Sequence, residues 1–148
     1  NRGYVPNGEE RLARMHGGDS PPDFKEVFAI GPCEVPQDPY YVAEAGYPNF
    51  VPNIWPERPL DFRPALQNYY KAMEGLTGLL LEICAMALGL EMTWFADKID
   101  RHTSHLRALY YPPPEGEFQP GQLRCGVHTD LGALTVLRNV AAPGGLEV

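Results

Sequence analysis

The sequence predicts a fold of the α+β class, on two patterns that follow each other along the chain. Between Pro64 and Leu90 apolar side chains recur at spacings of three and four, as in a helix that buries one face. After His105 the period becomes two, which is typical of strands with one buried face. A helix that precedes a run of strands favours α+β, and 148 residues fit one domain.

The first 59 residues hold ten of the sixteen prolines and predict ordered loop with short turns. Only short apolar pieces, such as 28–30 and 49–51, interrupt the Pro-Pro, Gly-Pro and Asp-Pro breaks. No longer regular element is expected before residue 60.

The long helix is expected over 64–90, with Asp61 as a plausible N-terminal cap and Gly89 as its C-terminal stop. Gly75 and Gly78 inside it cost roughly 1 kcal/mol each relative to alanine. Close packing against another element would explain them. The residues expected on the buried face are Leu66, Tyr69, Met73, Leu76, Leu80, Ile83, Ala87 and Leu90.

Downstream of this helix the pattern predicts one more short helix and then strands. Thr93 would cap the short helix, which runs to Asp100. Strands are expected over 105–111, 123–128 and 133–137, with the first two joined by a proline-rich hairpin loop, and a fourth would begin at 146–148. A strand at the last residues suggests that the polypeptide is part of a longer domain.

Composition excludes several classes of partner. Twelve Lys and Arg against nineteen Asp and Glu give a net charge of −7, and no basic run appears, so binding to nucleic acid or to an anionic membrane is not expected. The longest apolar stretch, 76–90, falls short of the roughly 20 residues that cross a bilayer.

The three cysteines point to a reducing compartment. Cys33, Cys84 and Cys125 are odd in number, widely spaced and in no CxxC pair, which argues against a disulfide framework or a thiolate zinc site. A cytoplasmic location is therefore expected.

The stretch His128-Thr129-Asp130 is the one that could do chemistry. In an extended chain residues two apart project to the same face, so an imidazole nitrogen and a carboxylate oxygen would lie side by side. A 2-His-1-carboxylate triad uses such a pair, together with a distant second histidine, to hold Fe(II) with open positions. A surface hydrogen bond between the two side chains explains the same spacing, and the pair alone does not decide between them.

Other candidates each have a plainer interpretation. His102 and His105 could ligate zinc together with His128, or they could lie at the rim of the fold, and His16 in a glycine-rich loop is expected to be exposed. Cys125 should point away from the chelating pair and into the core.

Arg107 and Tyr111 share one face of their predicted strand with Leu109. Either this cation and this phenol line a cavity, or that face of the strand is in water.

The order of several motifs is more specific than any one of them. The chain resembles the isopenicillin-N-synthase-like branch of the Fe(II)- and 2-oxoglutarate-dependent oxygenases over nearly its whole length. Leu109 replaces an asparagine of plant-type members, so the sequence looks more like microbial ones. The motifs that carry the resemblance are Gly3-Tyr4, Asp23-Phe24-Lys25-Glu26, Asn53-Ile54-Trp55-Pro56, Ala87-Leu88-Gly89-Leu90, Leu106-Arg107-Ala108-Leu109-Tyr110-Tyr111-Pro112-Pro113, His128-Thr129-Asp130 and Gly144-Gly145-Leu146-Glu147-Val148.

This resemblance implies a double-stranded β-helix, or jelly roll, with residues 1–148 as part of one oxygenase domain. It implies that His128 and Asp130 are the first two iron ligands. Tyr111 matches a tyrosine that reaches the 2-oxoglutarate carboxylate, and Arg107 a position that contacts an anionic substrate in some relatives. The second histidine ligand and an Arg-x-Ser motif that anchors 2-oxoglutarate are expected after Val148, and a further segment before Asn1.

The implied activity couples oxidative decarboxylation of 2-oxoglutarate by O₂ to hydroxylation, desaturation or ring closure of a small organic substrate. The cofactor set would be Fe(II), with 2-oxoglutarate as cosubstrate. Three alternatives stay open: an iron oxidase or cyclase without 2-oxoglutarate, an inactive fragment or binding module, and a zinc hydrolase.

Overall fold

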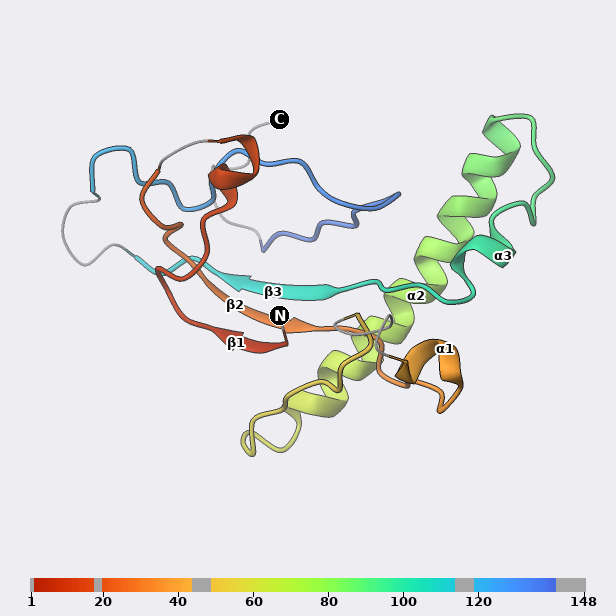
Figure 1. Ribbon diagram of the computed structural model, residues 1–148, viewed down its shortest axis with the longest axis horizontal. Coiled ribbons are helices and arrows are strands. Elements are labelled where there is room, and N and C mark those ends of the chain that lie inside the picture. Colours follow the sequence, from red (N-terminus) through yellow and green to blue (C-terminus); the bar gives the residue numbers. More distant parts are fainter. Residues whose placement is uncertain (1, 18–19, 44–48, 114–118, 141–148) are drawn as a thin grey trace.

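The computed structural model describes residues 2–17, 20–43, 49–113 and 119–140, and its centre is a three-stranded antiparallel sheet. The strands are β1 (Gly3–Val5), β2 (Glu26–Ile30) and β3 (Leu106–Tyr110), in the spatial order β1-β2-β3. Figure 1 shows the long helix α2 (Phe62–Ala87) running obliquely past the end of the sheet where β2 ends and β3 begins. Helix and sheet together confirm the α+β class.

Three shorter helical elements complete the described structure. A 3₁₀ helix, η1, spans Leu12–His16, and two single-turn helices, α1 and α3, span Pro39–Val42 and Ala96–Ile99. The expected short helix is thus present as α3, but the residue before it is Phe95 and the Thr93 cap is not formed. Over the described ranges, the structure contains no helical segment with the length and hydropathy of a membrane span.

Strand β2 forms the core of the sheet because it is paired on both sides. Tyr4 of β1 lies opposite Phe28, and Ala108 of β3 lies opposite the same residue on the other side. The side chains of Val27, Ala29 and Ile30 are buried. The expectation of loop throughout the first third is therefore wrong for β1 and β2, because pairing with distant strands stabilises short apolar pieces that have no strong local signal.

A single side chain holds the end of β2. The Oδ1 atom of Asn53 accepts a hydrogen bond from the Gly31 amide at 2.8 Å, while its Nδ2 donates to the Gly31 carbonyl at 3.2 Å and to the Pro32 carbonyl at 3.1 Å. The side chain of Asn53 therefore replaces a strand partner where β2 runs out. Two residues later, the ring of Trp55 lies 6.1 Å from that of Phe28.

Helix α2 is confirmed, and two contacts join it to the sheet. The ring of Phe62 packs edge-on against Phe28 of β2 at 4.8 Å, and the buried hydroxyl of Tyr70 donates to the Ser104 carbonyl at 3.1 Å. Asp61 occupies the N-cap position without a side-chain hydrogen bond. Gly89 ends the helix with a φ of 70° and donates to the Met86 carbonyl at 3.0 Å.

The buried stripe of α2 is displaced from the expected one. Its buried residues are Tyr70, Leu81 and Ala85, whereas Ile83 is 55% exposed. Close packing at Gly75 and Gly78 is not found, because a Cβ atom at either position would meet no described atom within 4 Å. Apolar residues at spacings of three and four can lie on either of two adjacent faces of a helix. The spacing therefore predicted the helix correctly but its buried face only approximately.

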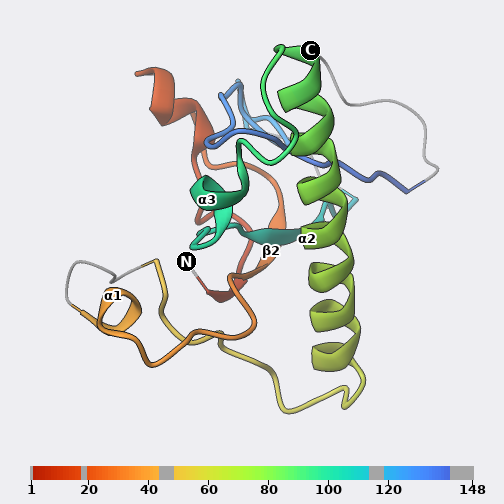
Figure 2. The same cartoon turned by 90° about the vertical axis from the view of Figure 1, so that its right-hand side faces the viewer.

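After β3 the described residues form turns, bends and irregular chain, without a further helix or strand. Residues 123–128 and 133–137 were expected as strands, and neither forms a ladder in the described structure. In Figures 1 and 2 the segment that follows β3 returns to the N-terminal segment instead of extending the sheet. The hairpin-loop residues 114–118 and the fourth strand at 146–148 lie outside the described residues.

Candidate metal-binding site

The segment that carries His128 and Asp130 is docked on residues 10–25. The Phe24 amide donates to the Leu123 carbonyl at 2.9 Å, and the Gln122 side chain donates to the Pro22 carbonyl at 3.0 Å. The Gly126 amide donates to Oδ1 of Asp23 at 3.0 Å. These three bonds join positions about 100 residues apart in the sequence and fix the course of the chain just before His128.

Beneath this segment lies a buried ion pair. Asp23 is 2% exposed and the Lys25 side chain is fully buried, with Nζ of Lys25 3.0 Å from Oδ2 of Asp23. Burial by itself lowers the pKa of Lys25, but its hydrogen bond to Asp23 and the nearby Cys125, Asp23 and Glu10 outweigh burial and raise the pKa above its usual value. Lys25 is therefore a permanent cation at neutral pH.

Glu10 extends this charge network to β3. One of its oxygens lies 3.3 Å from Nζ of Lys25, and its carboxylate accepts from Nη2 of Arg107 at 2.5 and 2.6 Å. Arg107 is opposite Ala29 in the register, on the same face of the sheet as Lys25 and Val27. The predicted cation therefore faces the docked segment, and it is paired with a carboxylate that the sequence did not single out.

The side chains of His128 and Asp130 come together, as the HxD spacing predicts. Nε2 of His128 lies 3.3 Å from Oδ1 of Asp130. Nδ1 of His128 is 2.8 Å from the Gly126 carbonyl, and because a carbonyl only accepts, Nδ1 carries the proton in this contact. Nε2 is then the ring nitrogen on the side of the Asp130 carboxylate, and it is the nitrogen through which the imidazole would ligate a metal.

The chemistry of this pair fits a divalent metal such as Fe(II). An imidazole nitrogen and a carboxylate oxygen at this separation can bind one ion, and both side chains are accessible, with 30% and 54% exposed. Among residues 2–17, 20–43, 49–113 and 119–140 no group of three His, Cys, Asp or Glu side chains is assembled around an ion site. The described residues therefore supply two ligands, as the resemblance implied.

Cys125 lies beside this pair, and Tyr111 lies beside Cys125. Burial, together with the neighbouring Cys125 and a hydrogen bond to it, raises the pKa of Tyr111, so the phenol keeps its proton at neutral pH. The Sγ atom of Cys125 is 3.5 Å from Nζ of Lys25 and 3.9 Å from Nδ1 of His128. The expectation that Cys125 points away from the chelating pair is wrong, because the segment is not a regular strand and period two does not apply to it.

The other histidines do not join the site. Nε2 of His102 pairs with Glu74 of α2 at 3.2 Å, and His105 is exposed at the start of β3. The side chain of His16 lies outside what the structure describes. In the described part of the chain the zinc site built from His102, His105 and His128 is not assembled.

Sequence reasoning missed four residues that shape the site: Glu10, Asp23, Lys25 and Gly126. Asp23 and Lys25 were part of a motif that carried the resemblance, without a role. Nothing in their local pattern predicts burial, because charged residues next to apolar ones are ordinarily exposed. The motif itself was the available signal.

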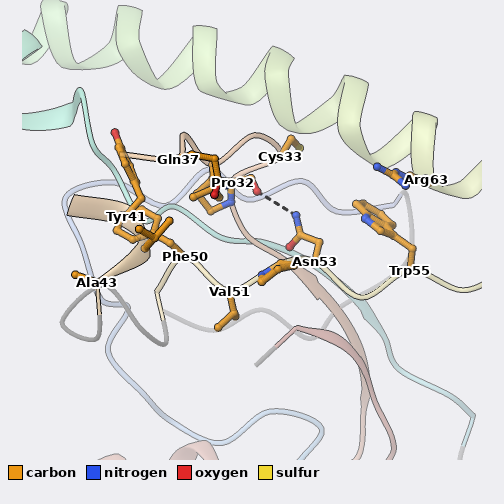
Figure 3. A pocket seen from close by; sticks show the side chains of 13 residues that line it. Pro32, Cys33, Gln37, Tyr41, Ala43, Phe50, Val51, Asn53, Trp55 and Arg63 are labelled. Atoms are coloured by element: carbon orange, nitrogen blue, oxygen red, sulfur yellow. Dashed lines mark hydrogen bonds between the residues drawn. The ribbon is translucent and has the colours of Figure 1, made fainter. Parts of the chain in front are cut away.

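A cavity of about 580 Å³ lies elsewhere, beside the segment 49–55 (Figure 3). Tyr41, Phe50 and Trp55 line it, and the guanidinium of Arg63 lies 5.6 Å from the Trp55 ring. None of the residues predicted to act on a metal or cosubstrate lines this cavity. Asn53, one of its polar side chains, is already engaged in holding β2.

Curated proteins with similar sequences include dioxygenases. The chain is 33% identical over 148 residues to the 2-oxoglutarate-dependent dioxygenase thnC of Trichoderma harzianum, covering 99% of this chain and 42% of that protein. It is 31% identical to the validamycin A dioxygenase of Streptomyces hygroscopicus subsp. limoneus, covering 99% and 39%. The chain spans about 40% of the length of these curated relatives. No protein-family model matches it.

Solved structures of the same class of oxygenase are also similar to this chain. A full-length Neurospora crassa protein in complex with alpha-KG matches with a TM-score of 0.66 and 28% identity, over 89% of this chain and 39% of that one. A 2OG-Fe(II) oxygenase family protein from Caulobacter crescentus matches with a TM-score of 0.60 and 30% identity, over 78% and 34%. The resemblance inferred from the motifs is thereby confirmed at the level of 2-oxoglutarate-dependent dioxygenases.

Proposed function

We propose that this chain, which is related to the Fe(II)- and 2-oxoglutarate-dependent dioxygenases, forms the part of such an enzyme that supplies two iron ligands. The single observation that carries the proposal is the pairing of His128 with Asp130. Nε2 and Oδ1 lie 3.3 Å apart, and Nδ1 is turned to the Gly126 carbonyl. The remaining protein ligand, a second histidine in this class of site, is not among the described residues.

The proposed fold of the whole domain is a double-stranded β-helix, to which the sheet β1-β2-β3 contributes one part. The likeness in fold to the Neurospora crassa and Caulobacter crescentus structures, with TM-scores of 0.66 and 0.60, supports this proposal. We treat residues 1–148 as belonging to a single oxygenase domain. The edge of β3 that faces away from β2 is then a natural place for a further strand.

Within this site each residue has a proposed task. His128 and Asp130 hold the metal, and Tyr111, as a protonated phenol, donates to a carboxylate oxygen of 2-oxoglutarate. Arg107 binds an anionic group of the substrate through its guanidinium. In the structure this guanidinium donates to the Glu10 carboxylate at 2.5 and 2.6 Å. Fe(II), when bound, would supply the redox chemistry that couples decarboxylation of 2-oxoglutarate to oxidation of a substrate.

The proposed substrate is a small organic molecule. A net charge of −7 without a basic patch gives no support to a nucleic-acid or membrane partner. The related Neurospora crassa protein was also solved in complex with alpha-KG and thymine, which is a small molecule. A cytoplasmic location is proposed from the three free cysteines.

Replacing Tyr111 by phenylalanine in the full-length protein should weaken 2-oxoglutarate binding by about 0.5–1.5 kcal/mol, the typical net value of one hydrogen bond. The ring and its contacts remain, so Fe(II) binding and folding should be little changed. The measurement is the 2-oxoglutarate concentration that gives half-maximal decarboxylation. Tyr110, 58% exposed on the other face of β3, provides the matched control variant Tyr110→Phe. An unchanged constant in Tyr111→Phe would refute the assigned task.

The experiment that tests the proposed function is to supply the full-length protein with Fe(II), 2-oxoglutarate and O₂ and to measure succinate and O₂ together. Succinate formed in proportion to O₂ consumed is the expected result. Consumption of O₂ with a candidate substrate but without succinate would favour an iron oxidase or cyclase. A protein that consumes neither O₂ nor 2-oxoglutarate and binds no Fe(II) would refute the proposal.

A further inference from the structure

We infer that Asp23 is a positioning residue for the metal-binding pair, acting on His128 through the backbone of Gly126. This inference rests on the proposed function and assigns a role that the iron ligands alone do not require. The geometry that carries it is a pair of hydrogen bonds on the two sides of the Gly126 Cα atom. Oδ1 of Asp23 accepts from the Gly126 amide at 3.0 Å, and the Gly126 carbonyl accepts from Nδ1 of His128 at 2.8 Å.

The second of these two hydrogen bonds decides what His128 can do. The imidazole has two nitrogens, and the one that donates to a carbonyl leaves the other with its lone pair. With Nδ1 held by the Gly126 carbonyl, Nε2 is aimed at Oδ1 of Asp130. A shift of the Gly126 carbonyl would change the direction of the ring and move Nε2 away from Asp130. Partners of this kind typically contribute about 10–100-fold in metal affinity.

The first bond decides where Gly126 lies, and Asp23 is built to hold it. Its carboxylate is 2% exposed and accepts three hydrogen bonds, from the Gly126 amide, from the Leu12 amide at 3.2 Å and from Nζ of Lys25 at 3.0 Å. An acceptor fixed by three donors from three parts of the chain has little freedom to rotate. The Lys25 ammonium lies 3.0 Å from Oδ2 and offers a charge-assisted hydrogen bond to this buried carboxylate.

Position 126 has no room for a side chain. A Cβ atom at this position would lie 2.9 Å from the Ala13 amide nitrogen, 3.0 Å from the Ala13 Cβ and 3.2 Å from Oδ1 of Asp23. Two of these contacts are shorter than or at the limit of what real side chains show, and one is with backbone. The glycine therefore allows the close approach on which the two hydrogen bonds depend.

The test compares two double variants of the full-length protein that have the same charge. Asp23→Asn with Lys25→Met keeps an oxygen acceptor for the Gly126 amide, whereas Asp23→Leu with Lys25→Met removes it. Fe(II) affinity is measured by anaerobic titration, and the free energy of unfolding is measured in parallel. We expect the leucine variant to bind Fe(II) about tenfold more weakly than the asparagine variant. Equal affinities would overturn the inference.

Two single variants keep the test independent of folding defects. Gly126→Ala leaves every charge in place. Its added Cβ would clash with Ala13 and displace the backbone at position 126, so this variant should also bind Fe(II) about tenfold more weakly. Asn53→Ala breaks three hydrogen bonds at the far end of β2 and should lower stability without weakening Fe(II) binding. If Asn53→Ala weakens Fe(II) binding as much as Gly126→Ala does, the effect is general destabilisation and the inference is wrong.

The proposed function and this inference fail in distinguishable ways. A wild-type protein that binds no Fe(II) would overturn both. A wild-type protein that binds Fe(II), with Gly126→Ala and the leucine variant unaffected, would overturn the positioning role of Asp23 alone.

Discussion

Replacing His128 or Asp130 by alanine in the full-length protein is expected to abolish 2-oxoglutarate turnover. Each substitution removes one of two donor atoms that lie 3.3 Å apart and are free to face the same ion. We expect turnover to fall by more than ~100-fold. Mutating a residue that only hydrogen-bonds to a metal ligand typically costs roughly 10–100-fold, and losing the ligand itself should cost more. The measurement is succinate formed per enzyme at saturating Fe(II).

Folding should survive either change, because substitutions on exposed side chains usually alter stability by less than about 0.5 kcal/mol. His102→Ala is the matched control, since His102 also pairs with a carboxylate, that of Glu74, at 3.2 Å. It should retain turnover. Retained activity in His128→Ala or Asp130→Ala would refute the ligand assignment, and loss of metal in His102→Ala would instead support a zinc site.

Replacing Lys25 by methionine should lower the free energy of unfolding by about 3–5 kcal/mol, the usual cost of removing one partner from a buried ion pair. The methionine fills the space of the lysine stem but leaves Asp23, which is 2% exposed, without its cation. Glu10 also loses a partner at 3.3 Å. Denaturant unfolding of wild type and variant measures the difference.

Two comparisons separate this cost from a general effect of losing a lysine. Lys71→Met breaks an ion pair of the same 3.0 Å length to Glu34, with 59% and 84% of the two side chains exposed, and should cost about 0–1 kcal/mol. Adding Asp23→Asn to Lys25→Met should recover part of the lost stability, because an uncharged amide then replaces the unpaired carboxylate. A loss below about 1 kcal/mol in Lys25→Met would contradict the buried pair.

The stability from Lys25 has a defined dependence on pH. Its pKa is raised in the folded state above the ordinary 10.5, so the ammonium form stabilises the fold. The contribution is fully present below pH 10.5 and is lost as pH rises through the higher folded pKa. In the alkaline range wild type should therefore lose stability toward the level of Lys25→Met, and near neutral pH the Lys25 charge adds no pH dependence.

Elements with a strong local signal were predictable from the sequence. Helix α2 repeats its apolar spacing along its 26 residues, and β3 is a short run rich in apolar residues that ends before a run of prolines. The proximity of His128 and Asp130 was expected from their separation of two positions, and it is found although the segment is not a regular strand. In each case the information lies within a few residues.

What could not be predicted depends on contacts between distant parts of the chain. β2 is a strand because β1 and β3 pair with it, and the buried state of Asp23 and Lys25 is created by segment 123–126, about 100 residues away. The segments 123–128 and 133–137 alternate like strands but have no ladder partner among the described residues. Periodicity indicates which side chains of a segment lie on the same face. Whether that face is paired or buried depends on the tertiary structure.

The most direct test of the central claim is an anaerobic titration of the full-length protein and its His128→Ala variant with Fe(II), monitored side by side. We expect one Fe(II) bound per wild-type chain and no specific binding in the variant, with both proteins folded. Equal Fe(II) stoichiometry and affinity in the two proteins would show that His128 and Asp130 do not form the iron site.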